Sequence, residues 1–90
     1  MKTKVENITS NSGNNIANQF IIRDENGNRF FQSYSSIIVK IDNNRKVYLD
    51  EFYWNYSKTT GKYRNMFLGE TKAETQSKID SGEYTLTNLN

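Results

Sequence analysis

The feature that most restricts what this chain can fold into is a series of polar turns set between β-prone segments. The first turn, residues 24–28, contains the Asn-Gly pair that suits a tight hairpin. The apolar run Phe20–Ile22 precedes this turn, and residues 29–32 resume the strand pattern. We therefore predict a β-hairpin across the turn.

A second polar turn, residues 42–45, separates two further segments of the same kind. The alternation over residues 36–41 places three apolar side chains on one face of a strand: Ile37, Val39 and Ile41. Residues 46–50 show the same alternation, with Val47 and Leu49 on one face, so we predict a second hairpin. The two hairpins together indicate an antiparallel sheet with one buried face and one wet face.

The C-terminal third contains a clear helix start. Residues 71–74 read Thr-Lys-Ala-Glu, which matches a capping box, in which the Thr and Glu side chains each bond the other residue's backbone amide. We expect a helix from about residue 72 to residue 81, ending at Gly82. Residues 83–87 alternate and are expected to form a closing strand that pairs with the sheet.

The segment 57–68 is compatible with two structures. As a hairpin it would turn at Thr60-Gly61, whereas as a helix it would begin at Ser57 or Thr59 and stop at Gly69. We favour the helix because four side chains recur at helical spacing: Tyr56, Thr60, Tyr63 and Phe67. The preference is small because Gly61 inside a helix would cost up to about 1 kcal/mol relative to Ala.

The chain of 90 residues is long enough for one compact domain and too short for two. Residues 1–15 are mostly polar, so we expect them to form a flexible N-terminal arm. We expect residues 16–90 to form a single globular α+β domain. Its fold class is a small, mostly antiparallel β-sheet of four or five strands with one or two short C-terminal helices.

The composition argues against catalysis. The chain contains neither His nor Cys, which removes the imidazole and thiolate groups used in most metal sites and much acid–base chemistry. The adjacent carboxylates Asp50 and Glu51 would point to opposite faces of a strand, so a metal site built on them would need ligands from elsewhere in the chain. We therefore expect no enzyme activity, no catalytic residue, no metal site and no cofactor.

Hydropathy points to a protein of the cell interior. The longest apolar runs, such as Ile37–Val39, contain three residues, far fewer than the roughly 20 that span a bilayer. The first residues are basic but lead into no apolar stretch, so we expect no secretory signal. The expected location is the cytoplasm, without contact to a membrane.

The best candidate for a binding region is a window that contains cations, hydroxyls and rings but no acid. Its residues are Trp54, Tyr56, Ser57, Lys58, Thr59, Thr60, Lys62, Tyr63 and Arg64. Cations, hydroxyls and rings are what a surface needs to follow phosphates and to stack bases. The structural interpretation carries more weight, since rings at helical spacing are more often part of a core and three cations are an ordinary solvated face.

Three segments resemble a known group of proteins: Phe31–Ile38, Trp54–Glu70 and Ser81–Tyr84. The central segment carries the pattern Trp-x-Tyr-Ser-x-Thr-Thr-x-Lys-Tyr followed by Phe-Leu-Gly. Over residues 18–90 the chain is similar to small uncharacterised proteins encoded by bacteriophages and mobile elements of low-GC or gut bacteria. The resemblance implies a biological setting, the host bacterial cell, and no mechanism.

Three kinds of partner follow from these observations. The first hypothesis is a non-enzymatic phage accessory protein that binds and modulates a host protein, for instance as an inhibitor of a defence nuclease. The second is a protein that binds single-stranded DNA or RNA through residues 54–64, against which the small net charge of +2 argues. The third is a structural protein or homodimer that pairs through exposed sheet edges.

Overall fold

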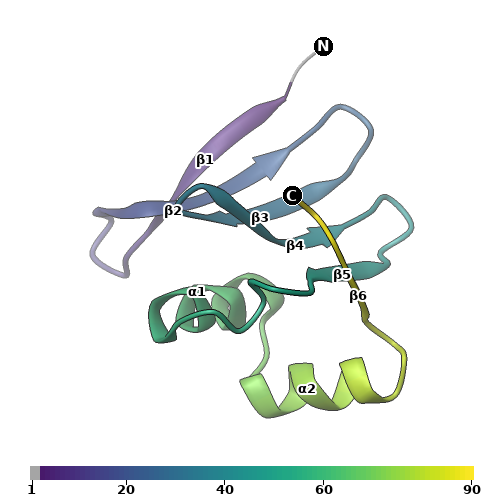
Figure 1. Cartoon of the computed structure of the whole chain (residues 1–90). Helices are drawn as coiled ribbons and strands as arrows, with labels where there is room; N and C mark the ends of the chain where they lie inside the picture. Colours follow the sequence, from purple (N-terminus) through teal and green to yellow (C-terminus); the bar gives the residue numbers. More distant parts are fainter. Residues whose placement is uncertain (1–2) are drawn as a thin grey trace.

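The computed structural model describes residues 3–90, within which the chain forms a six-stranded sheet and two helices (Figure 1). This architecture confirms the α+β class and the mostly antiparallel sheet. The elements in chain order are β1 (Lys4–Thr9), β2 (Asn15–Arg23), β3 (Arg29–Ser33), β4 (Ser36–Ile41), β5 (Val47–Asp50), α1 (Lys58–Leu68), α2 (Lys72–Asp80) and β6 (Thr85–Thr87).

The strands lie in the sheet in the same order as in the sequence. From β1 to β5 each strand pairs antiparallel with the next, which confirms both predicted hairpins. The last strand, β6, pairs parallel with β5. The parallel pair arises because the chain passes through both helices between these strands and returns in the original direction.

A β-bulge in β4 changes which side chains reach the core. Phe31 pairs with Val39 while the next residue, Gln32, pairs with Ile37, so Ile38 is the extra residue. Ile38 and Val39 are both buried, and Ile37 shares the opposite face with Gln32. The prediction that Ile37 lies on the same face as Val39 is therefore wrong.

The N-terminal segment differs from the flexible arm expected over residues 1–15. Residues 4–9 form β1, which pairs with β2 along its length, and Ile8 is buried in the core. Backbone pairing and one inserted apolar side chain thus order a segment whose composition is almost wholly polar. Residues 1–2 lie outside the described part of the chain.

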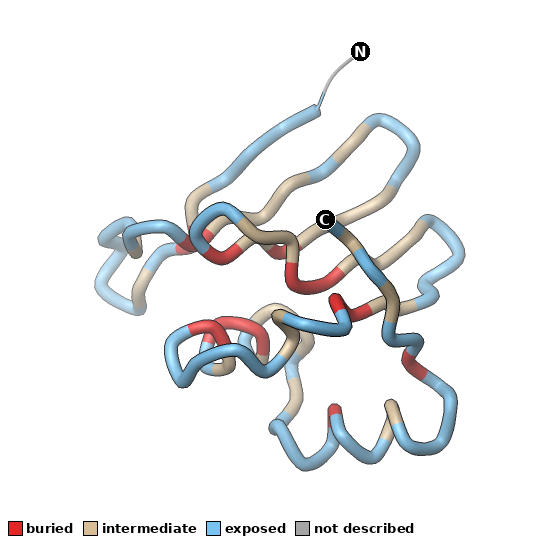
Figure 2. Tube along the Cα trace, in the orientation of Figure 1, coloured by how far each residue is buried: buried red, intermediate tan, exposed pale blue. Residues whose placement is uncertain are grey.

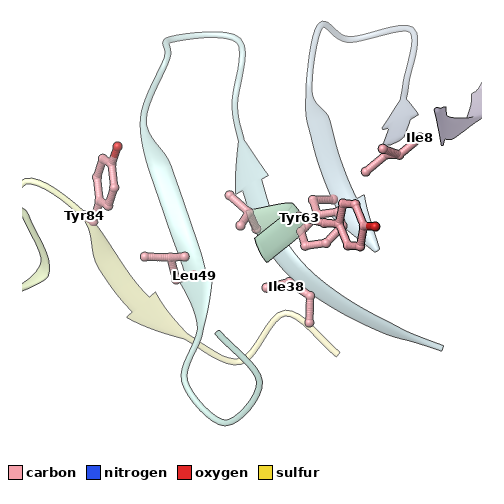
Figure 3. Packing of buried hydrophobic residues seen from close by; sticks show 7 residues of the cluster. Ile8, Ile38, Leu49, Tyr63 and Tyr84 are labelled. Atoms are coloured by element: carbon pink, nitrogen blue, oxygen red, sulfur yellow. The ribbon is translucent and has the colours of Figure 1, made fainter. Parts of the chain in front are cut away.

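One face of the sheet carries the core, and both helices lie on that side (Figures 1 and 2). The Phe67 ring of α1 stacks on the Phe31 ring of β3 with 5.9 Å between centroids. Figure 3 shows Tyr63 of α1 in the middle of the buried cluster, with Ile8 and Tyr84 toward its two ends. The core therefore joins the first strand, the central sheet, the first helix and the segment before β6.

The other face of the sheet is lined by half-buried side chains. Because side chains alternate along a strand, Phe30 points away from the face on which Phe31 meets α1. Strand pairing sets Phe30 beside Ile22 of β2 and Lys40 of β4. The Lys40 ammonium lies over the Phe30 ring and over the Tyr48 ring, at 5.9 and 5.7 Å from their centroids. We call this surface the open face.

The structure shows residues 57–68 as a helix with its cap, rather than as a hairpin. The Ser57 side chain accepts a hydrogen bond from the Thr60 amide at 3.1 Å, and Gly69 ends α1 in the left-handed conformation with φ of 70°. The predicted capping box of α2 is also present, between Thr71 and Glu74. Among residues 3–90, neither helix is long and apolar enough to cross a membrane.

Two buried carboxylates fix the segments around α1. Asp50 accepts hydrogen bonds from the amides of Phe52 and Tyr53, which shape the loop before the helix, and from Leu89 near the C-terminus. Burial by itself would raise the pKa of Asp50, but these bonds and one from the Asn90 side chain together lower it.

Glu70 fixes the chain in the same way just after the C-terminal end of α1. Its carboxylate accepts from Lys78 at 2.7 Å, from the Tyr84 hydroxyl at 2.7 Å and from the Thr75 hydroxyl at 3.1 Å. Burial opposes ionisation, yet these donors lower the pKa of Glu70. Burial and the bond to Glu70 raise the pKa of Tyr84 to about 12. A polar cluster thus ties α2 to the end of α1.

Candidate functional site

The nine residues predicted to form a binding region do not share one surface. Tyr63 and Thr60 are buried, and the Thr60 hydroxyl is hydrogen-bonded to Ser33 of β3 at 3.0 Å. Trp54 is half-buried. The others divide between two hollows on either side of the first turn of α1, apart from Thr59, which is exposed and lines neither hollow.

The larger hollow, which we call the basic groove, runs along α1 to the start of α2. Its volume is about 670 Å³. Four of its lining residues are cations: Lys58, Lys62 and Arg64 of α1, and Lys72, the first residue of α2. The remaining lining residues are neutral: Asn55, Ser57, Gly61 and Asn65. No acidic residue of the described chain lines this groove.

Arg64 is the most unusual residue of the groove because it is buried without a carboxylate partner. Its guanidinium donates to the Trp54 carbonyl and, at 3.0 Å, to the Asn65 side-chain oxygen, and it lies 5.3 Å from the centre of the Trp54 ring. Within residues 3–90 the two salt bridges lie elsewhere, and the Arg64 Nε has no hydrogen-bond partner.

Burial of the Arg64 guanidinium is unfavourable, and its pKa reflects this. Burial lowers the pKa of Arg64 from its ordinary value, although the negative charge of Glu70 opposes the change. A guanidinium nevertheless stays charged at any physiological pH. A buried cation whose hydrogen-bond partners are neutral projects a positive potential that water screens little. The groove is therefore positive both at its rim, through the lysines, and from beneath.

Gly61 lies directly against the Arg64 guanidinium. A side-chain methyl at this position would sit 3.6 Å from Arg64 Nη2 and 3.7 Å from Nη1, which is ordinary contact. Arg64 is fully buried, and Gly61 adds no side chain over its guanidinium. An anion in the groove beside Gly61 would therefore have no side chain of residue 61 between it and the guanidinium.

The smaller hollow, which we call the aromatic recess, lies between two loops. Its volume is about 370 Å³, and its rings are Tyr34 from the β3–β4 turn and Tyr53 and Tyr56 from the loop before α1. Tyr53 and Tyr56 meet edge to face with 5.5 Å between centroids. The remaining lining residues are Ser33, Ser35, Ser36, Ile38 and Thr60. The recess is neutral, whereas the groove is cationic.

Several lining residues were not part of the predicted binding region. Lys72 reaches the groove from α2, and Tyr34 reaches the recess from a turn twenty or more residues earlier in the chain. Asn55 and Asn65 also line the groove, and each is a sequence neighbour of a residue in the predicted binding region. Only the folded arrangement of the turn, the loop and the two helices brings these side chains together.

Carboxylates and other metal-ligating side chains do not gather in either hollow. Among the described residues, no group of three or more Asp, Glu, Cys or His side chains is placed to hold a metal ion. The chemistry available in the two hollows is therefore that of ammonium and guanidinium groups, amides, hydroxyls and rings. This set binds anions and planar rings.

Searches of curated proteins and of solved structures each find no match to this chain. A family model described as a family of unknown function, DUF8033, matches residues 3–83, which includes the basic groove and the aromatic recess. The chain therefore belongs to the DUF8033 family.

Proposed function

We propose that this protein is a non-enzymatic, cytoplasmic protein that binds single-stranded nucleic acid through the basic groove. The observation that carries the proposal is Arg64, a buried cation without a carboxylate partner in the described chain, beneath a groove lined by three lysines and no acid. Buried charges are normally paired, and a phosphate in the groove would supply the missing negative charge.

The surroundings of the groove favour a nucleic-acid strand over a small anion. Lys58 and Lys62 are exposed one turn apart on α1, and Lys72 extends the cationic lining to α2. A row of cations suits a chain of phosphates better than a single one. Tyr56, with 69% of its surface exposed, stands just before the helix and offers a ring for stacking.

The small net charge of +2 predicts modest affinity and a shallow dependence on salt. Each phosphate contacted on a single strand contributes about −0.7 to the slope of log K against log salt concentration. Contacts from the three lysines of the groove would therefore give a slope of about −2. A much steeper slope would require cations outside the groove.

Fluorescence polarisation with a labelled single strand at several salt concentrations tests this proposal. The test variant is Lys58→Glu/Lys62→Glu, and the matched control is Lys4→Glu/Lys46→Glu, which changes the net charge equally at exposed positions outside the groove. We expect salt-sensitive binding that the test variant abolishes and the control retains. Absence of binding at low salt, or equal loss in both variants, would contradict the proposal.

The open face supports a second candidate, binding of a host protein. Ile22 and Phe30 lie side by side on it with Lys40 and Tyr48, all half-buried, and Val5 of β1 extends this row with 62% of its surface exposed. Such an apolar row suits a protein partner better than a phosphate chain. Recovery of one host protein in stoichiometric yield by the wild type, and not by Phe30→Asp, would support this candidate.

Two earlier hypotheses stay predictions. A bacteriophage setting, with modulation of a host defence protein, is supported by the resemblance of the segments around Trp54–Glu70. A homodimer formed through sheet edges is compatible with the outer edges of β1 and β6, which lie at the two ends of the sheet. Sedimentation would measure the dimer directly.

A further inference from the structure

The aromatic recess lies beside the basic groove, and the two share the first turn of α1. Ser57, Lys58 and Gly61 line the groove, whereas Thr60 lines the recess. A strand whose phosphates follow the lysines would therefore have a neutral, ring-lined hollow within reach of its bases. The recess is the smaller of the two hollows, and its volume of about 370 Å³ is at the low end for small-molecule sites.

The lining of the recess suits a planar, uncharged and polar group. Its exposed rings, Tyr34 and Tyr56, come from two different loops that border the hollow, and Ser35 and Ser36 add hydroxyls that both donate and accept. No charged residue of the described chain lines it. A nucleobase combines a face for stacking with an edge of donors and acceptors, whereas a phosphate would find no cation there.

Tyr34 is held in a backbone conformation that an aromatic residue seldom adopts. Its φ is 57°, in the left-handed region, and its amide donates to the Asn18 carbonyl at 2.7 Å. Glycine and asparagine are the usual residues at such turn positions, and a tyrosine there costs of order 1 kcal/mol. The ring gains little from burial in return, since 55% of the residue is exposed. Contact with a ligand would explain why a ring occupies this position.

We propose that the aromatic recess takes one unpaired base of the strand whose phosphates lie in the basic groove, an inference that rests on the proposed function. Tyr56 supplies the stacking surface, and the serine hydroxyls contact the edge of the base. Because a base of a duplex would first have to be separated from its complement, the protein binds single strands in preference to duplexes.

Polarisation with three labelled probes of equal length tests the inference: a mixed-sequence single strand, an abasic strand that carries phosphates without bases, and a duplex. The key variant is Tyr56→Ala, with Tyr56→Phe as the conservative change. Phe52→Ala is the matched control, because Phe52 is an exposed ring (74%) in the same loop that lines neither hollow. Circular dichroism checks the fold of each variant.

We expect Tyr56→Ala to weaken binding of the base-bearing strand by about tenfold, the usual value of one stacked base. Tyr56→Phe and Phe52→Ala should bind as the wild type does. The abasic strand and the duplex should bind more weakly than the single strand, and Tyr56→Ala should not change them further.

The outcomes separate this inference from the proposed function. If the wild type binds the abasic strand as tightly as the base-bearing one, or if Tyr56→Ala and Phe52→Ala weaken binding equally, the recess holds no base, although the basic groove still binds phosphates. If none of the three probes binds at low salt, the proposed function fails and the inference fails with it.

Discussion

Replacing Gly61 by Ala should make the protein more stable and a weaker binder. Gly61 lies inside α1 with helical φ, so alanine meets no backbone strain there. The added methyl would contact Arg64 Nη2 at 3.6 Å, an ordinary van der Waals distance. Glycine in a helix interior costs up to about 1 kcal/mol relative to alanine, so the variant should gain about that much. For a domain of this size the melting temperature would rise by about 4–8 °C.

The same methyl would lie between an anion in the groove and the Arg64 guanidinium. Loss of one charge-assisted hydrogen bond, about 1.5–3 kcal/mol, would weaken binding of a single strand by about tenfold or more. Urea denaturation followed by the fluorescence of Trp54, the single tryptophan, measures stability, and polarisation measures affinity. Ser77→Ala, at an exposed position in α2, is the control that changes helix propensity without touching the groove.

Two results would contradict the role assigned to Gly61. A Gly61→Ala protein that is more stable yet binds the strand as tightly as the wild type would show that no anion approaches Arg64 over Gly61. A variant that is less stable would show that the methyl does not fit against the guanidinium. If Ser77→Ala lost affinity as well, the loss could not be assigned to the groove.

The remaining predictions concern the polar interactions that hold the site in place. Glu70→Gln should lower the free energy of unfolding by about 2 kcal/mol at neutral pH, because it weakens charge-assisted bonds from Lys78 and Tyr84. Since the folded-state pKa of Glu70 is below its ordinary value of 4.5, this contribution is complete above that pH and is lost as the pH falls, so urea titrations of the two proteins should converge in acid. Asp50→Ala should lower the free energy of unfolding by about 3 kcal/mol or more, because it removes a buried carboxylate that accepts from three part-buried amides, and hydrogen exchange should become faster in residues 51–56 and 88–90. Thr71→Ala should cost about 1 kcal/mol through loss of the capping box, and an unchanged denaturation midpoint would contradict that role.

The fold was predictable from the sequence wherever its signals are local. The Asn-Gly turn and the alternation around residues 42–45 specify both hairpins, and the capping box at Thr71 specifies α2, because each depends on neighbours along the chain. The helix over residues 57–68 was the preferred alternative, and its Ser57 cap and Gly69 stop are both present. Gly61, which made that preference small, lines the proposed groove.

Features that depend on distant residues were not predictable in this way. The strand β1 is ordered by pairing with β2 and by the insertion of Ile8 into the core, neither of which its polar composition indicates. A β-bulge is defined by pairing with a neighbouring strand, so the extra residue Ile38 could not be recognised from the sequence of β4 alone. The window 54–64 did contain the cations of α1, but it could not indicate which side chains would be buried, such as Tyr63, or that Lys72 and Tyr34 would join the two hollows.

The most direct test of strand binding in the basic groove is a nuclear magnetic resonance titration of the labelled protein with a short single strand. We expect amide signals of residues 55–65 and of Lys72 to shift together as strand is added, and signals of the Tyr34 turn to shift only when the strand carries bases. Signals of the open face, such as those of Ile22 and Phe30, should stay unchanged. Shifts confined to the open face, or no shifts at low salt, would contradict the claim that the groove beneath the lysines and over Arg64 binds nucleic acid.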